Sequence, residues 1–86
     1  MYNYQEIKPS LFTEQGQVMF LKVRDNVQEL LKTAGAVRMQ EAISGCTGSS
    51  WDMLACVDRL VELKEIREIT GDDVAGQHRV FVATND

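Results

Sequence analysis

The stretch that decides the fold runs from Ala36 to Thr84 and reads AVRMQEAISGCTGSSWDMLACVDRLVELKEIREITGDDVAGQHRVFVAT. Apolar residues recur at helical spacing over 39–44, and a short polar turn follows. A second helical pattern occupies 49–64. Two runs rich in β-forming residues, 66–70 and 77–83, flank a segment of glycine and aspartate. The order helix, turn, helix, hairpin predicts an exposed helix beside a β-hairpin.

A long amphipathic helix is predicted before this stretch, over 13–34. Thr13 is placed for an N-cap, and Gly35 for the left-handed residue that ends a helix. The core-facing stripe consists of Phe20, Val23, Val27, Leu30, Leu31 and Ala34. Val18 and Leu21 project away from this stripe. A second surface should therefore cover them, either the N-terminal arm or a second subunit.

Residues 1–12 are expected to form an N-terminal arm, because they are too apolar for a loose tail. Pro9 cannot continue a helix through its position and favours an extended Lys8. The aromatic residues of the arm are Tyr2, Tyr4 and Phe12. We expect the arm to dock on its own core or on a second subunit.

The helix predicted over 50–64 has Ser49 as N-cap and Asp52 in the position of a capping box. Its buried stripe is predicted to be Met53, Leu54, Val57, Leu60, Val61 and Leu63. The opposite face should be exposed and carry Ser50, Trp51, Asp52, Ala55, Asp58, Arg59 and Glu62. In the hairpin, Val80 and Val82 should share one face of the sheet. Residues 36–38 are long enough for a short strand, and 71–76 have the composition of a mobile tip.

Composition sets the broad class of protein. The 86 residues suffice for a single domain, and their net charge is −4. No apolar run approaches the ~20 residues that span a bilayer, and the N-terminus lacks the features of a signal peptide. A cytoplasmic protein is expected. Cys46 and Cys56 should then be reduced, inert thiols. A redox-sensitive Cys46 and a metal ligand are the alternatives.

The run Asp58–Ile69 resembles the end of the recognition helix and the start of the wing in winged helix-turn-helix domains. Leu60, Leu63 and Ile66 match the anchoring leucines and the first isoleucine of the wing. The run 77–82 resembles the returning wing strand. These domains often have glycine just before the wing, where this chain has Lys64-Glu65. The resemblance implies an α+β fold of three helices plus a C-terminal two-stranded β-hairpin wing, in one domain over 1–86.

The resemblance also implies a small DNA-binding regulator of the bacterial or phage type. In such a protein the helix over 50–64 enters the major groove of double-stranded DNA, and the wing contacts the backbone. The candidate DNA-binding residues are Ser49, Ser50, Arg59, Arg67, His78 and Arg79.

The charges on the same helix favour a different role. Asp52, Asp58 and Glu62 would face a polyanion, and the net charge is negative. Trp51 is a natural interface anchor. The alternative function is therefore a winged-helix protein-protein interaction module without intrinsic DNA binding, with homodimer formation. Its candidate interface residues are Trp51, Ala55, Tyr2, Tyr4 and Phe12.

Each of these residues also has a purely structural interpretation. Trp51 can pack against the arm, and Arg59 can pair with Asp52, Glu62 or another nearby acid. Arg67 and Arg79 can pair with Glu68 across the sheet. No phosphate-binding loop, nucleophile elbow or metal motif occurs in the sequence. We therefore expect no enzymatic activity, no cofactor and no metal.

Overall fold

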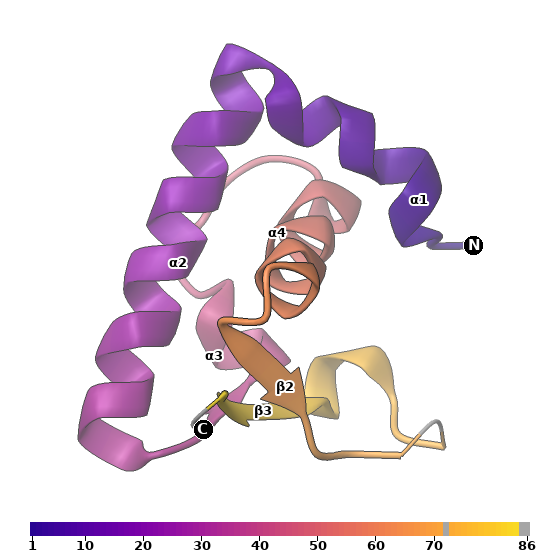
Figure 1. Cartoon of the computed structure of the whole chain (residues 1–86). Coiled ribbons are helices and arrows are strands. Elements are labelled where there is room, and N and C mark those ends of the chain that lie inside the picture. The colour runs from indigo at the N-terminus through magenta and orange to yellow at the C-terminus, as the bar shows by residue number, and fades with distance from the viewer. Residues whose placement is uncertain (72, 85–86) are drawn as a thin grey trace.

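A computed structural model of the chain describes residues 1–71 and 73–84 (Figure 1). Over these residues the fold is α+β, with four α-helices and a three-stranded antiparallel sheet. The long helix α2 (Glu14–Ala34) lies along one side, and α4 (Ser50–Glu62) lies beside it, above the sheet (Figure 1). The short helix α3 (Met39–Ala42) joins them. The predicted mobile tip includes Asp72, which lies outside the described residues.

Both predicted ends of α2 are confirmed. The Thr13 hydroxyl accepts a hydrogen bond from the Gly16 amide at 3.0 Å. Gly35 has a φ of 80°, and its amide donates to the Leu31 carbonyl. These contacts satisfy backbone groups that a helix leaves unpaired at its ends.

The sheet differs from the predicted two-stranded hairpin. Its strands are β1 (Val37–Arg38), β2 (Ile66–Glu68) and β3 (Val80–Ala83), in the order β1-β3-β2. The predicted antiparallel pair is present as β2 and β3, and the short strand expected within 36–38 is present as β1. The prediction missed that β1 pairs with the free edge of β3, with Val37 opposite Phe81. Gln77 and His78, predicted as strand, belong to the short 3₁₀ helix η2 (Gly76–His78).

The arm is helical rather than extended. It consists of α1 (Tyr4–Ile7) and the 3₁₀ helix η1 (Lys8–Phe12). Lys8 has φ −46° and ψ −43°, so the expected extended conformation is wrong. Pro9 occupies the first turn of η1, where a missing amide hydrogen costs nothing.

The core lies between α2, α4 and the inner face of the sheet. Its largest fully buried side chains are Phe81, Leu11, Met39, Leu60, Ile66, Val23, Val27, Val37 and Val57. The predicted phase of α4 is partly wrong. Ala55, expected to be exposed, is fully buried, and Leu63, expected to be buried, is 43% exposed. Leu63 follows the last residue of α4, where the chain turns toward β2.

Lys64 lies in the turn between α4 and β2. It has a φ of 63°, and it is the one non-glycine residue with positive φ in the described chain. An L-residue in this region costs roughly 1–2 kcal/mol, which explains why glycine is commoner at such a turn. No helix within 1–71 or 73–84 is long and apolar enough to cross a membrane.

Candidate functional site

The arm docks on α4, the helix that would enter the major groove of DNA if the resemblance to winged helix-turn-helix domains holds for function. Figure 1 shows the arm passing from the start of α2 to the far side of α4. The Tyr2 hydroxyl donates a hydrogen bond to Asp58 at 2.5 Å, and the Tyr4 hydroxyl donates to Glu62 at 2.6 Å. Ser10 donates to Asp52 at 2.8 Å. The expectation that the arm docks on its own core is therefore met, through the carboxylates of α4.

Asp52 does not close the predicted capping box. Ser49 is the N-cap of α4, but its side chain accepts no capping hydrogen bond. Asp52 instead accepts the hydrogen bond from Ser10. Ala55 lies one turn beyond Asp52 and one turn before Asp58. The arm contacts both ends of that interval, and Ala55 between them is fully buried as part of the core.

The Glu62 carboxylate accepts hydrogen bonds from three side chains, two of the arm and one of α4. Lys8 and Arg59 each bind it at 2.8 Å, in addition to the Tyr4 hydroxyl. These hydrogen bonds, from Lys8 first and then from Tyr4 and Arg59, lower the pKa of Glu62 to about 2. Glu62 therefore stays ionised and holds the arm against α4 at neutral pH.

Arg79 joins the sheet to α4. Its guanidinium lies 2.9 Å from Asp58 and 2.9 Å from Glu68, and it stacks over the Phe81 ring at 5.1 Å. Burial opposes its charge, but the hydrogen bonds to Glu68 and Asp58 outweigh burial and raise its pKa. Because Tyr2 binds the same Asp58, the arm, α4 and the sheet meet at this carboxylate. Sequence reasoning missed this role, since it treated Asp58 only as a charge opposing DNA.

The predicted DNA-binding residues do not form one cationic surface. Arg59 and Arg79 are paired with Glu62 and with Asp58 and Glu68. The remaining four are exposed: Ser49 and Ser50 at the start of α4, Arg67 on β2 and His78 in η2. Of Arg67 and Arg79, only Arg67 has no ion pair with the residues that the structure describes.

The predicted interface residues divide between arm and surface. Trp51 is exposed and packs edge-to-face on Tyr2, with ring centroids 6.5 Å apart. Tyr2 and Tyr4 are half-buried on α4, and desolvation followed by the hydrogen bonds to Asp58 and Glu62 raises the pKa of each phenol. Phe12 is exposed, with the Arg59 guanidinium 5.3 Å above its ring.

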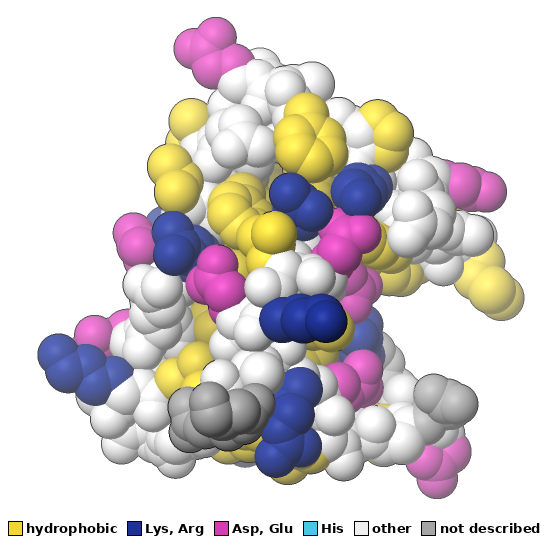
Figure 2. Space-filling view, in the orientation of Figure 1, with side chains coloured by type: hydrophobic (Ala, Val, Ile, Leu, Met, Phe, Trp, Pro, Cys, Tyr) yellow, Lys and Arg dark blue, Asp and Glu magenta, His cyan; other side chains and the backbone are white. Residues whose placement is uncertain are grey.

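A second surface, here called the apolar face, lies next to Phe12. It consists of Phe12, Phe20 and Leu63, which line one hollow, together with the exposed Val18 and Leu21 on the same turns of α2 as Phe20. Val18 is 66% exposed and Leu21 is 53% exposed, so the expectation that the arm covers them is wrong. The arm folds toward α4 instead. Figure 2 shows hydrophobic side chains gathered in the upper part of this view, beside α2 and the end of α4.

The apolar face contains a hollow of about 280 Å³. Its walls are Leu11, Phe12, Gln17, Phe20, Arg59 and Leu63. Hydrophobic periodicity did not predict this hollow, because it assigned Phe20 and Leu63 to buried stripes. The sequence signal for an open apolar surface was the position of Val18 and Leu21 outside the core-facing stripe of α2. Such a hollow can accept one bulky apolar side chain from another molecule.

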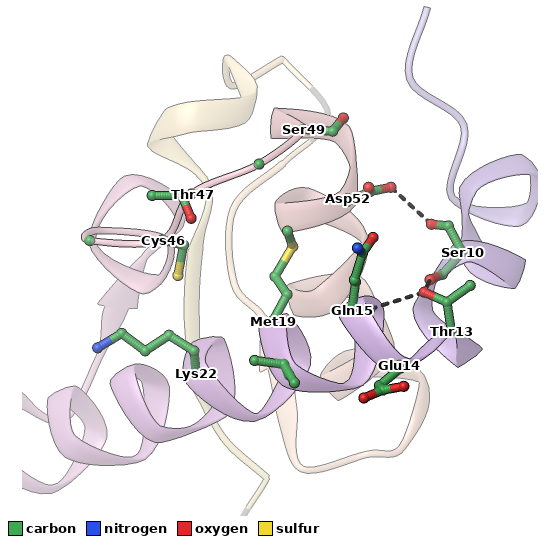
Figure 3. Close-up of a pocket in the computed structure, with 14 residues that line it drawn as sticks. Ser10, Thr13, Glu14, Gln15, Met19, Lys22, Cys46, Thr47, Ser49 and Asp52 are labelled. Atoms are coloured by element: carbon green, nitrogen blue, oxygen red, sulfur yellow. Dashed lines mark hydrogen bonds between the residues drawn. The ribbon is translucent and has the colours of Figure 1, made fainter.

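A larger open hollow of about 1110 Å³ separates the start of α2 from the start of α4 (Figure 3). Gln15 and Met19 extend from α2 toward α4, while Lys22 and Cys46 lie toward the other end. Burial raises the pKa of Cys46 despite the charge of Lys22, so its thiol is a weak nucleophile at neutral pH. The lining offers neither a general-base pair nor a group of anion donors.

The cysteines are both free thiols. Cys56 lies in the core, and burial first, then the nearby Cys46 and Asp52, raise its pKa to about 12. Within the described ranges, no three His, Cys, Asp or Glu side chains come together in a way that could hold a metal ion. The cytoplasmic location stays a prediction.

The charges at the arm predict a pH window for docking. The pKa of Glu62 falls from 4.5 to about 2. The stabilisation that the ionised Glu62 gives to arm docking is therefore complete above pH 4.5 and is lost as the pH drops toward 2. The pKa values of Tyr2 and Tyr4 rise above 10.0, so their contribution is complete below pH 10.0 and is lost at higher pH. The NMR signal of the indole N–H of Trp51, the only tryptophan, should stay constant inside this window and shift outside it.

Two variants assign the limits of that window. Glu62→Gln should flatten the acid part of the curve of the Trp51 indole signal against pH, because an amide side chain gains no proton in that range. Tyr4→Phe should weaken the alkaline limb and leave the acid limb in place. An indole signal that does not move between pH 7 and pH 2 would show that the carboxylates do not hold the arm.

Comparison of the chain with protein-family models, with curated proteins and with solved structures finds no match in any of the three. The contacts described above therefore carry the functional assignment on their own.

Proposed function

We propose that this chain is a winged-helix-type protein-interaction module that pairs with a second copy of itself and has no intrinsic affinity for DNA. The observation that carries the proposal is the apolar face, on which Val18 is 66% and Leu21 53% exposed. Exposed apolar patches of this kind mark protein interfaces. Three other residues of the apolar face, Phe12, Phe20 and Leu63, line one hollow.

The charges at the edge of the apolar face support a second copy as the partner. Arg24 pairs with Glu65 at 3.2 Å, and Arg59 pairs with Glu62 at 2.8 Å. In a two-fold contact each surface meets itself, so unpaired charges of one sign would repel. The charges at the edge of the apolar face are already paired within the chain, so like charges of the two copies do not repel each other across the contact.

The state of α4 supports the absence of DNA binding. Affinity for duplex DNA depends on cations that neutralise phosphates. Arg59 and Arg79 already bind carboxylates of the same chain, and the arm lies over the face that would enter the groove. A phosphate would have to displace those carboxylates and approach Asp52 as well.

Sedimentation equilibrium of the wild type and of Leu21→Glu tests the pairing. The wild type should associate at micromolar concentration, and the new carboxylate should raise the dimer dissociation constant at least tenfold, about 1.4 kcal/mol. Ile69→Glu is the matched control, because Ile69 is also 53% exposed but follows β2, away from the apolar face. It should leave the dimer unchanged. A wild type that remains monomeric at the highest soluble concentration would contradict the pairing.

A DNA-binding regulator is the second candidate, supported by the outer face of the sheet. Arg38 lies opposite Val80 and Arg67 opposite Val82, so the two arginines share one face. A mobility shift with random duplex at low salt separates the two functions. The interaction module should give no shift. Binding that Arg67→Ala weakens, with a salt slope reduced by ~1, would favour the regulator.

A further inference from the structure

The geometry points to an exchangeable arm: in the dimer, residues 1–12 of one copy dock on α4 of the other. This inference rests on the self-association proposed above, and it names the segment that crosses between the two copies. The arm is the ligand, and the carboxylates Asp52, Asp58 and Glu62 of α4 are the site.

The chemistry of docking is the same within one chain and between two. Tyr2 and Tyr4 donate hydroxyl hydrogen bonds to Asp58 and Glu62, and Lys8 adds a cation 2.8 Å from Glu62. In these contacts the donors belong to the arm and the acceptors to α4, and Gln17 of α2 in addition donates to the Leu11 carbonyl at 2.6 Å. An arm from a second copy offers identical donors to identical acceptors, so exchange conserves every one of these contacts.

The arm is also loosely held for a segment of its size. Leu11 is the only one of its described side chains that is fully buried. The hydrogen bonds from Tyr4 and Lys8 to Glu62 are exposed to solvent, which weakens their hold. Opening exposes Leu11 and breaks the part-buried hydrogen bonds of Tyr2 and Ser10, and the same contacts re-form when the arm docks on the second copy.

The hinge between arm and core is a single residue. The helix η1 ends at Phe12, α2 begins at Glu14, and only Thr13 lies between them. Short hinges favour exchange between copies, because reversing the chain within so few residues is harder than extending it. Thr13 already has an extended backbone, with φ −82° and ψ 164°.

The hinge adjoins the apolar face. Phe12 belongs to the arm and to that face, and Val18 and Leu21 lie within the first turns of α2. In a two-fold contact the same residues of both copies meet. Two copies seated on this face therefore bring their hinges close together, so that each arm can reach the other copy.

A mixing experiment detects an arm that acts on another molecule. The first variant, Trp51→Phe, keeps the intact arm and has no tryptophan. The second variant, Tyr2→Phe with Tyr4→Phe, keeps Trp51 but lacks both arm hydroxyls. The two are mixed after joint unfolding and refolding, and the indole N–H signal of Trp51 is recorded. Circular dichroism of each variant alone verifies that it folds.

Exchange predicts that the indole signal of the mixture moves from the position of the second variant toward that of the wild type. The shift should grow with the share of the first variant, because only its arms carry the hydroxyls. Adding Leu21→Glu to both variants should abolish the shift. A mixture whose spectrum equals that of the second variant alone, although sedimentation shows a dimer, would overturn exchange and leave the pairing intact. Monomers in sedimentation would overturn both.

Discussion

Replacing Leu60 with alanine should lower the free energy of unfolding by ~2–5 kcal/mol, because the change removes buried methyl groups and leaves a cavity. Leu60 is 1% exposed and lies at the centre of the buried face of α4. Domains are stabilised by only about 5–15 kcal/mol in total, so the variant should lose much of its stability. Urea denaturation followed by circular dichroism measures the loss.

Leu63→Ala is the matched control for that measurement. The substitution is the same and lies on the next turn of the chain, but Leu63 is 43% exposed. At protein concentrations low enough to keep the chain monomeric, the loss should be below ~1 kcal/mol, because less apolar surface is returned to water. Equal losses at both positions would show that the observed burial of α4 is wrong and that the stripe predicted from the sequence is right.

The features predicted correctly are those that depend on neighbours in the sequence. Thr13 caps α2 through an amide three residues away, and Gly35 ends it with a left-handed backbone. Hydrophobic spacing also located Leu60 and Val57 in the core. Such contacts lie within one or two helical turns, where the residue types nearly determine the geometry.

The features that the sequence did not reveal depend on the arm. Tyr2 finds its acceptor 56 residues away, and Tyr4 finds its own 58 residues away. Periodicity cannot report such pairs, and it also assigned Ala55, which is fully buried in the core, to an exposed face. The same limit applies to Arg79, whose pairing with Glu68 was foreseen but whose contact with Asp58 was not.

Gly16 is the residue whose role the sequence could have indicated. A glycine inside a helix costs roughly 0.5–1 kcal/mol relative to alanine, so its presence requires a reason. The structure provides one: a Cβ atom at position 16 would lie 2.2 Å from the Ser10 carbonyl oxygen and 2.7 Å from the Leu11 Cα. Both are backbone atoms of the arm, which cannot move aside as a flexible side chain would.

Gly16→Ala should therefore release the arm while α2 stays folded. The helix itself gains from alanine. The arm loses the burial of Leu11, worth ~1.5–3 kcal/mol, together with its hydrogen bonds to α4. Two measurements report the release. The indole N–H signal of Trp51 should shift at neutral pH, and proteases should cut the arm within 1–12 faster than in the wild type.

Gly76→Ala provides the comparison for this variant. Gly76 has no atom within 4 Å of the added Cβ and no positive φ, so alanine should change neither stability nor the indole signal. A Gly16→Ala protein that keeps the wild-type indole signal and gains stability would show that the arm adapts to the extra methyl group. In that case the close approach at Gly16 would not fix the arm on α4, and the hydrogen bonds from the arm to Asp52, Asp58 and Glu62 would hold it.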